Sequence, residues 1–275
     1  MRLLTDSRGA ECAELDAFNL DGLLYGLTVR WLPESDGDLD LAAAEREAQA
    51  LMASLRASGA RHFESRIVRE TTGVDPILLA RRAASHTSLL RALGFEPHGG
   101  RIEVRLPVDQ AIDRITLRVR EPRLAWQTIA TERGPDLDRA AALMQIACVG
   151  DPNSSPDDDA LGFLLARLDD EDTLHTPETL QIGVRDGRDA VILILAVNPA
   201  NGWCSHHYLG VAPEHRQLGL SVEAMLHGLR TMHALGGREY HDGTSAGNHA
   251  ALRLLEALGP GRRTVLEQWA QRSAT

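Results

Sequence analysis

Lysine is absent from this sequence of 275 residues, so all 29 of its Lys and Arg positions are arginine. The absence excludes a catalytic or Schiff-base lysine. Cysteine is scarce, and its three copies, Cys12, Cys148 and Cys204, lie far apart. An odd number of cysteines at these spacings makes neither a disulfide framework nor a Cys-x-x-Cys zinc pattern. We therefore expect a reducing, cytoplasmic environment.

Basic charge is also in short supply. The 29 arginines face 39 acidic residues, and the formal net charge is −10. Nucleic-acid binding needs a basic surface, so this balance argues against a nucleic-acid partner. It favours a cationic amine through long-range attraction. No apolar run reaches the roughly 20 residues that span a bilayer, and the acidic N-terminus does not resemble a signal peptide, so we expect no membrane association.

Aromatic residues make up only 4 % of the chain, so the core must be built mainly from Leu, Ala, Val and Ile. A content of 43 % hydrophobic and 25 % charged residues is that of a soluble globular protein. The length is compatible with one large domain or two modest ones.

The segment from Trp203 to Leu229 predicts a strand, a short turn and a helix. An apolar run ends at Pro213, which cannot donate to a strand ladder. Apolar residues then recur at helical spacing. The free N–H groups of the first helical turn and the positive end of the helix dipole form an anion site. Gly219 lets backbone approach a bulky anion, and Arg216 adds a positive charge. The alternative interpretation is an ordinary strand–turn–helix unit with an exposed arginine.

The spacing in this segment, Val211-x-Pro-x-x-Arg-x-x-Gly-x-Ser221, resembles the acetyl-CoA-binding motif of the GNAT superfamily of N-acetyltransferases. Ser221 stands where that family usually has Gly or Ala. The resemblance implies that acetyl-CoA, or another short acyl-CoA, is the cofactor. It implies cofactor contacts from a run of strand and loop residues: Leu209, Gly210, Val211, Arg216, Gln217, Leu218, Gly219, Leu220 and Ser221.

A second stretch, from Asn248 to Gly259, resembles the late motif of the same family. Asn248 is a candidate for orienting the cofactor, or it only caps the helix. Leu255 stands where the family usually has a tyrosine that protonates the departing CoA thiolate. The departure puts the standard general acid in doubt.

The sequence predicts an internal repeat, because residues 89–94 and 254–259 nearly match in sequence and the same order of elements surrounds both. The alternative is a chance match between two amphipathic helices rich in Leu and Ala. We predict a degenerate, partial GNAT-like domain over residues 1–110 and a GNAT acetyltransferase domain over residues 111–275. In the first half, the place of the phosphate loop carries Asp36, Asp38 and Asp40, which would repel a diphosphate. The expected fold class is α/β (α+β), with mixed, mostly antiparallel sheets flanked by helices and a splayed strand at the acetyl-CoA site.

Periodicity and turn residues place the other elements. Residues 109–114 are expected to link the two halves. The expected helices cover residues 41–58, 77–93, 137–149, 160–168 and 248–258. The expected strands cover residues 22–32, 61–70, 101–108, 181–186, 189–197, 203–211, 238–242 and 264–270.

The acid and base residues are less determined by the sequence. Acyl transfer to an amine needs a neutral amine and therefore a proton acceptor. His206, His207 and Tyr240 are the candidates, and strand alternation predicts that His207 faces away from His206 and Tyr208. The alternative for each histidine is a partly buried structural residue. We expect no metal site, because no His-x-x-x-His helix pair is present.

The function predicted from these features is an acetyl-CoA-dependent N-acetyltransferase that acts on a small amine by direct transfer in a ternary complex. A non-catalytic acyl-CoA-binding or regulatory protein is the alternative, and Leu255 favours it. The sequence leaves the acceptor amine open, and it is compatible with a homodimer.

Overall fold

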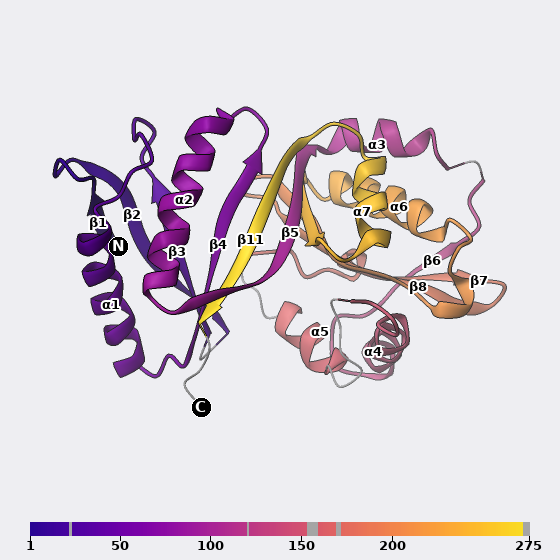
Figure 1. Cartoon of the computed structure of the whole chain (residues 1–275). Coiled ribbons are helices and arrows are strands. Elements are labelled where there is room, and N and C mark those ends of the chain that lie inside the picture. Colours follow the sequence, from indigo (N-terminus) through magenta and orange to yellow (C-terminus); the bar gives the residue numbers. More distant parts are fainter. Residues whose placement is uncertain (22–23, 120, 153–158, 169–171, 272–275) are drawn as a thin grey trace. The chain divides into compact units, whose positions relative to one another are not determined.

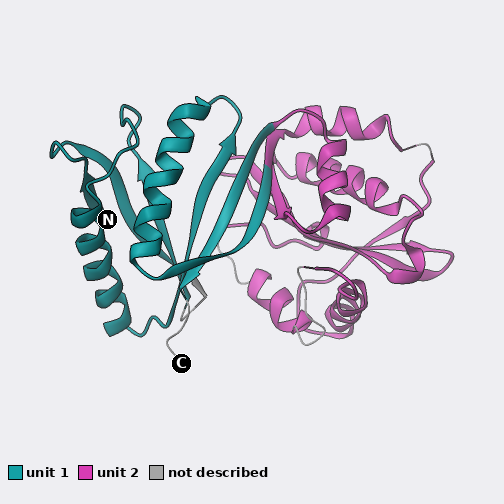
Figure 2. Ribbon diagram, in the orientation of Figure 1, with its two compact units in different colours: residues 1–103, 262–275 teal, residues 104–261 magenta. Residues whose placement is uncertain are grey.

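A computed structural model describes residues 1–21, 24–119, 121–152, 159–168 and 172–271 of the chain (Figure 1). The chain forms two compact units (Figure 2). Unit 1 consists of residues 1–103 and 262–275, and unit 2 consists of residues 104–261. Among the described residues, none of the helices is long and apolar enough to cross a membrane.

The sheet of unit 1 has the strand order β1-β2-β3-β4-β11-β5. Neighbouring strands are antiparallel in the pairs β1/β2, β2/β3 and β4/β11, and β3 and β4 are parallel. The helices α1 and α2 bury their apolar sides in one core with this sheet. The bounds are β1 Arg2–Thr5, β2 Glu11–Asp21, β3 Leu24–Trp31, α1 Leu41–Ala57, β4 His62–Thr71, α2 Pro76–Ala92, β5 Phe95–Pro107 and β11 Arg262–Gln271.

Both helices of unit 1 begin and end at signals that the sequence displays. The Asp40 side chain accepts a hydrogen bond from the N–H of Ala43 and starts α1, as N-cap residues do. Asp75 caps α2. Gly59 and Gly94 follow the two helices with positive φ, which is the usual helix end at glycine. These two helices match the predicted ones closely because the signals are local.

The last strand differs from the sequence expectation. We expected it to complete the second half, but β11 pairs with β4 over the register from Thr264↔Thr71 to Ala270↔Glu64. Trp269 of this strand is buried in the core of unit 1. The compact units are therefore not the two halves of the sequence. The division into GNAT-like repeats near residue 110 stays a prediction.

The sheet of unit 2 has the order β10-β9-β8-β7-β6, with β9 and β10 parallel and the other pairs antiparallel. This mixed, mostly antiparallel arrangement confirms the predicted fold class. The bounds are α3 Val108–Thr116, β6 Ala125–Thr128, α4 Pro135–Ala147, α5 Ala160–Leu168, β7 Leu180–Arg185, β8 Arg188–Asn198, β9 Trp203–Val211, α6 Leu220–Ala234, β10 Glu239–Ser245 and α7 His249–Ala257.

Helices cover both faces of the unit 2 sheet. In β8, Val191, Leu193 and Leu195 pack in the core that includes residues of α3, α6 and α7. The alternate residues Ile192 and Ile194 pack in the core that includes residues of α4 and α5. A strand buried on both faces reads as a continuous apolar run, which explains why the sequence showed this strand clearly.

The expected linker at residues 109–114 was wrong, because this segment belongs to α3. Val108, Ala111 and Ile115 are fully buried and recur at helical spacing. Residues 115 and 116 end this helix. Because the helix is only nine residues long and starts directly after Pro107, its apolar spacing is carried by few positions.

The order strand, helix, strand, helix, strand occurs twice, as β3-α1-β4-α2-β5 and as β9-α6-β10-α7-β11. The first two strands of each series are parallel neighbours. Gly94 and Gly259 follow the second helix of each series with similar positive φ values of 77° and 81°.

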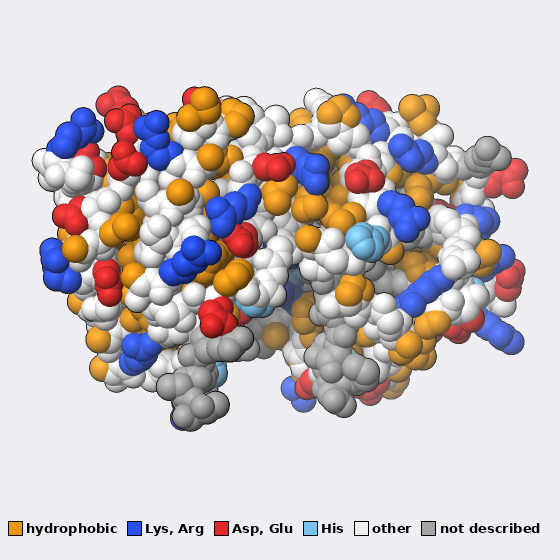
Figure 3. All heavy atoms as spheres, viewed as in Figure 1, with side chains coloured by type: hydrophobic (Ala, Val, Ile, Leu, Met, Phe, Trp, Pro, Cys, Tyr) orange, Lys and Arg blue, Asp and Glu red, His pale blue; other side chains and the backbone are white. Residues whose placement is uncertain are grey.

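In the view of Figure 3, arginine and carboxylate side chains are interspersed, so this face carries no large basic patch.

Candidate functional site

Strands β9 and β10 separate soon after they start. In the described residues, their parallel ladder contains the pairs Trp203↔Glu239 and Cys204↔Tyr240. Beyond these pairs, β9 continues to Val211 and β10 to Ser245. The parallel pairing of the described residues therefore ends near the start of both strands, and this divergence is the splay expected from the sequence.

A cavity of about 720 Å³ lies beside the second half of β9. Its walls come from the end of α4, from β9, from the loop before α6, and from the starts of α6 and α7. All but one of the predicted cofactor residues line it, and the exception is the exposed Leu218. The predicted residues that line it are Leu209, Gly210, Val211, Arg216, Gln217, Gly219, Leu220, Ser221 and Asn248.

The loop before α6 has the backbone of an anion-binding turn. Gln217 and Gly219 both have positive φ, at 62° and 75°. Gly219 is the N-cap of α6 and supplies no side-chain hydrogen bond to the first turn. The first N–H groups of the helix are therefore left for a ligand, with the positive end of the helix dipole behind them.

Arg216 was expected to present a positive charge to a ligand, but its guanidinium also binds two backbone carbonyls. Its Nε donates to the carbonyl of Val211 at 3.1 Å, and its Nη2 donates to the carbonyl of Ala147 at 2.8 Å. The guanidinium therefore joins the end of β9 to the end of α4. Its charge remains at the cavity wall, but two of its donors are already satisfied by backbone.

A second arginine, which was not predicted from the sequence, lies beside this loop. Arg123 Nη2 lies 3.3 Å from the position that a Cβ on Gly219 would occupy. Glu223 holds the segment of Arg123 in place, because its Oε1 accepts the N–H groups of Arg123 and Leu124, each at 2.9 Å. Glu223 is 6 % exposed and lies on the inner side of α6. A glutamate on an otherwise apolar helix face was the signal that could have found this contact.

His206 and Tyr240, two of the predicted catalytic residues, lie together beside the splay. Tyr240 Oη donates to Asp242 Oδ2 at 2.6 Å, and His206 Nδ1 lies 3.0 Å from the same hydroxyl. Because the tyrosine proton is directed to Asp242, we assign the Nδ1 proton to His206. Burial lowers the pKa of His206 to about 3, and burial together with Asp242 raises the pKa of Tyr240 well above its ordinary value. At neutral pH the cluster is a directed chain from His206 through Tyr240 to Asp242.

His207 lies apart from this cluster. Its ring faces Trp203 with a centroid separation of 6.2 Å, and it lines a small recess with Leu164 and Leu168 of α5. The expectation that His206 and Tyr208 share a face was wrong. A β-bulge in β9 inserts an extra residue between them, so that His206 lies against α6 and Tyr208 against α4.

Asn248 caps α7 by accepting the N–H of Ala251 at 3.1 Å, and its Nδ2 lies 3.3 Å from Asp151 Oδ1. It also lines the cavity, so the capping role and a ligand contact are compatible. Leu255, at the position of the family's tyrosine, is buried in the core of unit 2. Among the described residues, no group of three His, Cys, Asp or Glu side chains is arranged to hold a metal ion.

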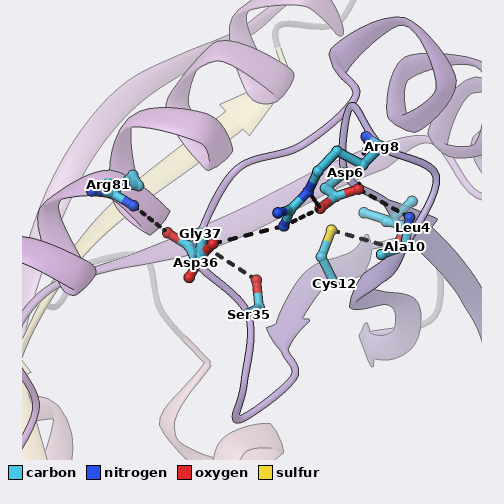
Figure 4. A network of polar contacts seen from close by, with 9 residues as sticks. All are labelled: Leu4, Asp6, Arg8, Ala10, Cys12, Ser35, Asp36, Gly37 and Arg81. Atoms are coloured by element: carbon cyan, nitrogen blue, oxygen red, sulfur yellow. Dashed lines mark hydrogen bonds and ion pairs between the residues drawn. The ribbon is translucent and has the colours of Figure 1, made fainter.

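The corresponding loop of unit 1, between β3 and α1, has the opposite character (Figure 4). A cavity there, also of about 720 Å³, is lined by carboxylates, which include Asp6, Asp36 and Asp38. Arg8 pairs with Asp6 at 2.9 Å and with Asp36 at 3.7 Å. The loop itself is held by Arg82, whose Nη2 donates to the carbonyls of Leu32 and Ser35, each at 3.0 Å. This acidic and internally bonded loop is unsuited to a diphosphate.

Sequence comparison finds no matching protein-family model and no matching curated protein. Solved structures do match. A GCN5-related N-acetyltransferase from Sphaerobacter thermophilus is 17 % identical with a TM-score of 0.59, and the match covers 98 % of this chain and 80 % of that one. A tandem GNAT protein from the clavulanic acid biosynthesis pathway is 16 % identical with a TM-score of 0.58, and covers 99 % and 83 %. A GCN5-related N-acetyltransferase from Kribbella flavida is 12 % identical with a TM-score of 0.58, covering 94 % and 87 %. The chain therefore has the GNAT fold.

Proposed function

We propose that this protein is an acyl-CoA-dependent N-acyltransferase that transfers an acetyl or another short acyl group directly to a small amine. The observation that carries the proposal is the cavity beside β9, which extends from the part of β9 beyond its pairing with β10 to the open N-terminus of α6. Such a cavity can hold an extended thioester with its anionic end on a helix N-terminus.

The residues of the cavity fit acyl-CoA. Gly219 leaves space where a Cβ would approach Arg123, and the N–H groups from Gln217 to Ser221 are the proposed diphosphate donors. The β9 backbone from Leu209 to Val211 is the proposed contact for the pantetheine arm. When bound, acyl-CoA would supply an activated acyl group as a thioester.

The proposed proton acceptor for the amine is Asp242, which is partly exposed. Tyr240 and His206 are proposed as positioning residues, because their hydrogen bonds direct one carboxylate oxygen toward the hydroxyl of Tyr240. A fixed carboxylate near the splay can take the proton that the amine loses as it attacks. A catalytic role for His207 stays a prediction, since it lies outside this cluster.

The acceptor is proposed to be a cationic small amine. The formal net charge of −10 favours such a substrate through long-range attraction.

The second candidate function is a non-catalytic acyl-CoA-binding protein. It is favoured by the buried Leu255, which stands where the family has a tyrosine and carries no hydroxyl.

The two candidates are separated by measuring binding and turnover on the full chain. Calorimetry with acetyl-CoA tests binding, and release of free CoA thiol is then followed with a panel of polyamines, aminoglycosides, arylalkylamines and amino acids. We expect binding together with amine-dependent thiol release. Binding without release from any amine supports the binding protein, and no binding of acetyl-CoA contradicts both.

A further inference from the structure

The β-bulge in β9 orients the side chain of Tyr208 toward the cavity. The ladder with β8 pairs Ile194 with Tyr208 and Leu195 with His206, so His207 is the extra residue. A bulge interrupts the alternation of side chains between the two faces of a strand. Without it, Tyr208 would point to the same side as His206, into the core beneath α6. With it, Tyr208 lines the cavity, and its hydroxyl lies 3.3 Å from Sγ of Cys148 at the end of α4.

Two small residues make room for this orientation. A Cβ on Gly210 would lie 2.9 Å from Oη of Tyr208 and 2.8 Å from Cβ of Ala147, and real Cβ atoms do not tolerate such contacts. Glycine is therefore required here for close approach. The ring of Tyr208 lies over Gly210, along the part of β9 that lines the cavity.

The order of residues along β9 places Tyr208 away from the anion-binding loop. The loop residues Gln217 and Gly219 follow the strand's end at Val211, and Tyr208 precedes Val211 by a strand length of about 10 Å. In the proposed function, the diphosphate binds at the loop and the acyl arm extends away from it along β9. The reactive end of the arm therefore approaches Tyr208.

We infer that Tyr208 is the proton donor to the sulfur that leaves during acyl transfer, an inference that rests on the proposed function. The amine nitrogen forms a bond to the acyl carbon, and the carbon–sulfur bond breaks with its electron pair on sulfur. The phenolic proton of Tyr208 passes to that sulfur and gives the free thiol. The amine loses one proton, proposed to go to Asp242, which passes it on to solvent, and solvent returns a proton to the phenolate. Amine and thioester thus become amide and thiol with no net gain or loss of protons.

Tyr208 carries its proton at neutral pH, as an ordinary phenol does. Burial raises its pKa further, with contributions from the neighbouring Cys148 and Asp151, whereas the charge of Arg216, which would stabilise a phenolate, lowers it. The hydroxyl of Tyr240 already donates to Asp242 and is fully buried. Leu255 carries no proton to give. Tyr208 is thus the phenol that is both protonated and in contact with the cavity.

The kinetic test compares Tyr208→Phe with the matched variant Tyr25→Phe, which removes the same hydroxyl from unit 1, where Tyr25 packs near Phe63. For the Tyr208 variant we expect kcat to fall by about 100-fold or more, with the KM for acetyl-CoA within about twofold of the original value. The Tyr25 variant should keep its activity. A Tyr208→Phe protein with more than about half of the original kcat overturns the inference, as does a parallel change of kcat and KM.

A binding measurement supplies a readout that needs no turnover. CoA carries the thiol, and desulfo-CoA lacks the sulfur. We expect Tyr208→Phe to bind CoA about fivefold more weakly, the effect of one hydrogen bond, and to bind desulfo-CoA unchanged. Equal effects on both ligands contradict a contact between Tyr208 and sulfur. If the original protein turns over no amine, the proposed function itself fails, which is a different outcome from an active Tyr208→Phe variant.

Discussion

Gly219 and Arg216 stand close together in one loop, but the structure gives them different roles. Gly219 has a backbone conformation that side chains rarely adopt, and a Cβ there would lie 3.3 Å from Nη2 of Arg123. Arg216 donates hydrogen bonds to two backbone carbonyls. At the scale of single residues, the motif therefore combines one ligand-facing position with one that holds the wall of the cavity together.

We predict that Gly219→Asp weakens acetyl-CoA binding by at least about tenfold, because it adds strain at positive φ and a negative charge at the helix N-terminus. Calorimetry measures the effect. Gly187→Asp is the matched control, since Gly187 has the same φ of 75° in the β7–β8 turn and an open Cβ position. Unchanged affinity in Gly219→Asp would remove the assignment of this loop as the diphosphate site.

Arg216→Gln should lower the free energy of unfolding by about 1.5–3 kcal/mol, because the partly buried carbonyls of Val211 and Ala147 lose their charged donors. Urea denaturation measures this change. The exposed Arg133 provides the control, and Arg133→Gln should unfold like the original protein. A variant at position 216 that keeps its stability and loses only acetyl-CoA affinity would instead support direct contact with the diphosphate.

At the scale of elements, the loop before α1 and the loop before α6 occupy equivalent places in their units but differ in the groups that they leave for a ligand. Both follow a strand with a parallel neighbour and precede a helix. The loop before α6 leaves N–H groups open, whereas the loop before α1 has Asp40 as a side-chain cap and Arg82 bound to its carbonyls. A capped and bonded loop has few groups left for a ligand.

We predict that Arg82→Ala speeds amide hydrogen exchange in residues 32–40 and leaves acetyl-CoA affinity unchanged. The side chain of Arg82 joins α2 to the carbonyls of Leu32 and Ser35, so its loss lets this loop open locally. Arg81→Ala is a neighbouring control, since Arg81 makes one longer bond of 3.4 Å to the carbonyl of Asp36. Weaker acetyl-CoA binding in Arg82→Ala would indicate that unit 1 contributes to the cofactor site.

Elements with local signals were predicted well from the sequence, and elements without them were not. The helices α1 and α7 begin at Asp40 and Asn248 and are followed by glycine with positive φ, and these signals act over a few residues. The strands β1 and β2 were missed, because their stability comes from pairing with each other and with β3. The bulge in β9 was also missed, since alternation is the default for a strand.

Buried neutral histidines make the stability of the whole molecule depend on pH. Burial lowers the pKa of His86 to about 4 and that of His206 to about 3, from the ordinary value of 6.5. Between pH 6.5 and about 4 the unfolded chain binds protons that the folded chain does not. Stability is therefore fully present above pH 6.5 and falls on acidification.

We expect the free energy of unfolding to fall by roughly 3 kcal/mol per pH unit in this window, at about 1.4 kcal/mol for each of the two fully buried groups. The partly buried His227, whose pKa burial also lowers to about 4, adds to this slope. Urea denaturation at several pH values measures the slope. His86→Gln should reduce it by roughly a third to a half, and the exposed His249→Gln should leave it unchanged. A stability that is constant from pH 7 to pH 5 would show that these histidines are protonated in the folded protein.

The sequence by itself determined the features that depend on neighbours along the chain: most helices, the conformation of the Gly219 loop, and the unsuitable charge of the loop at Asp36. These follow from backbone sterics, capping and local charge. Only the tertiary structure decided which strands β11 pairs with and which carbonyls accept hydrogen bonds from Arg216. It also decided on which face of β9 the side chain of Tyr208 lies. Those outcomes depend on partners far away in the sequence, and a one-residue bulge is enough to exchange the two faces of a strand.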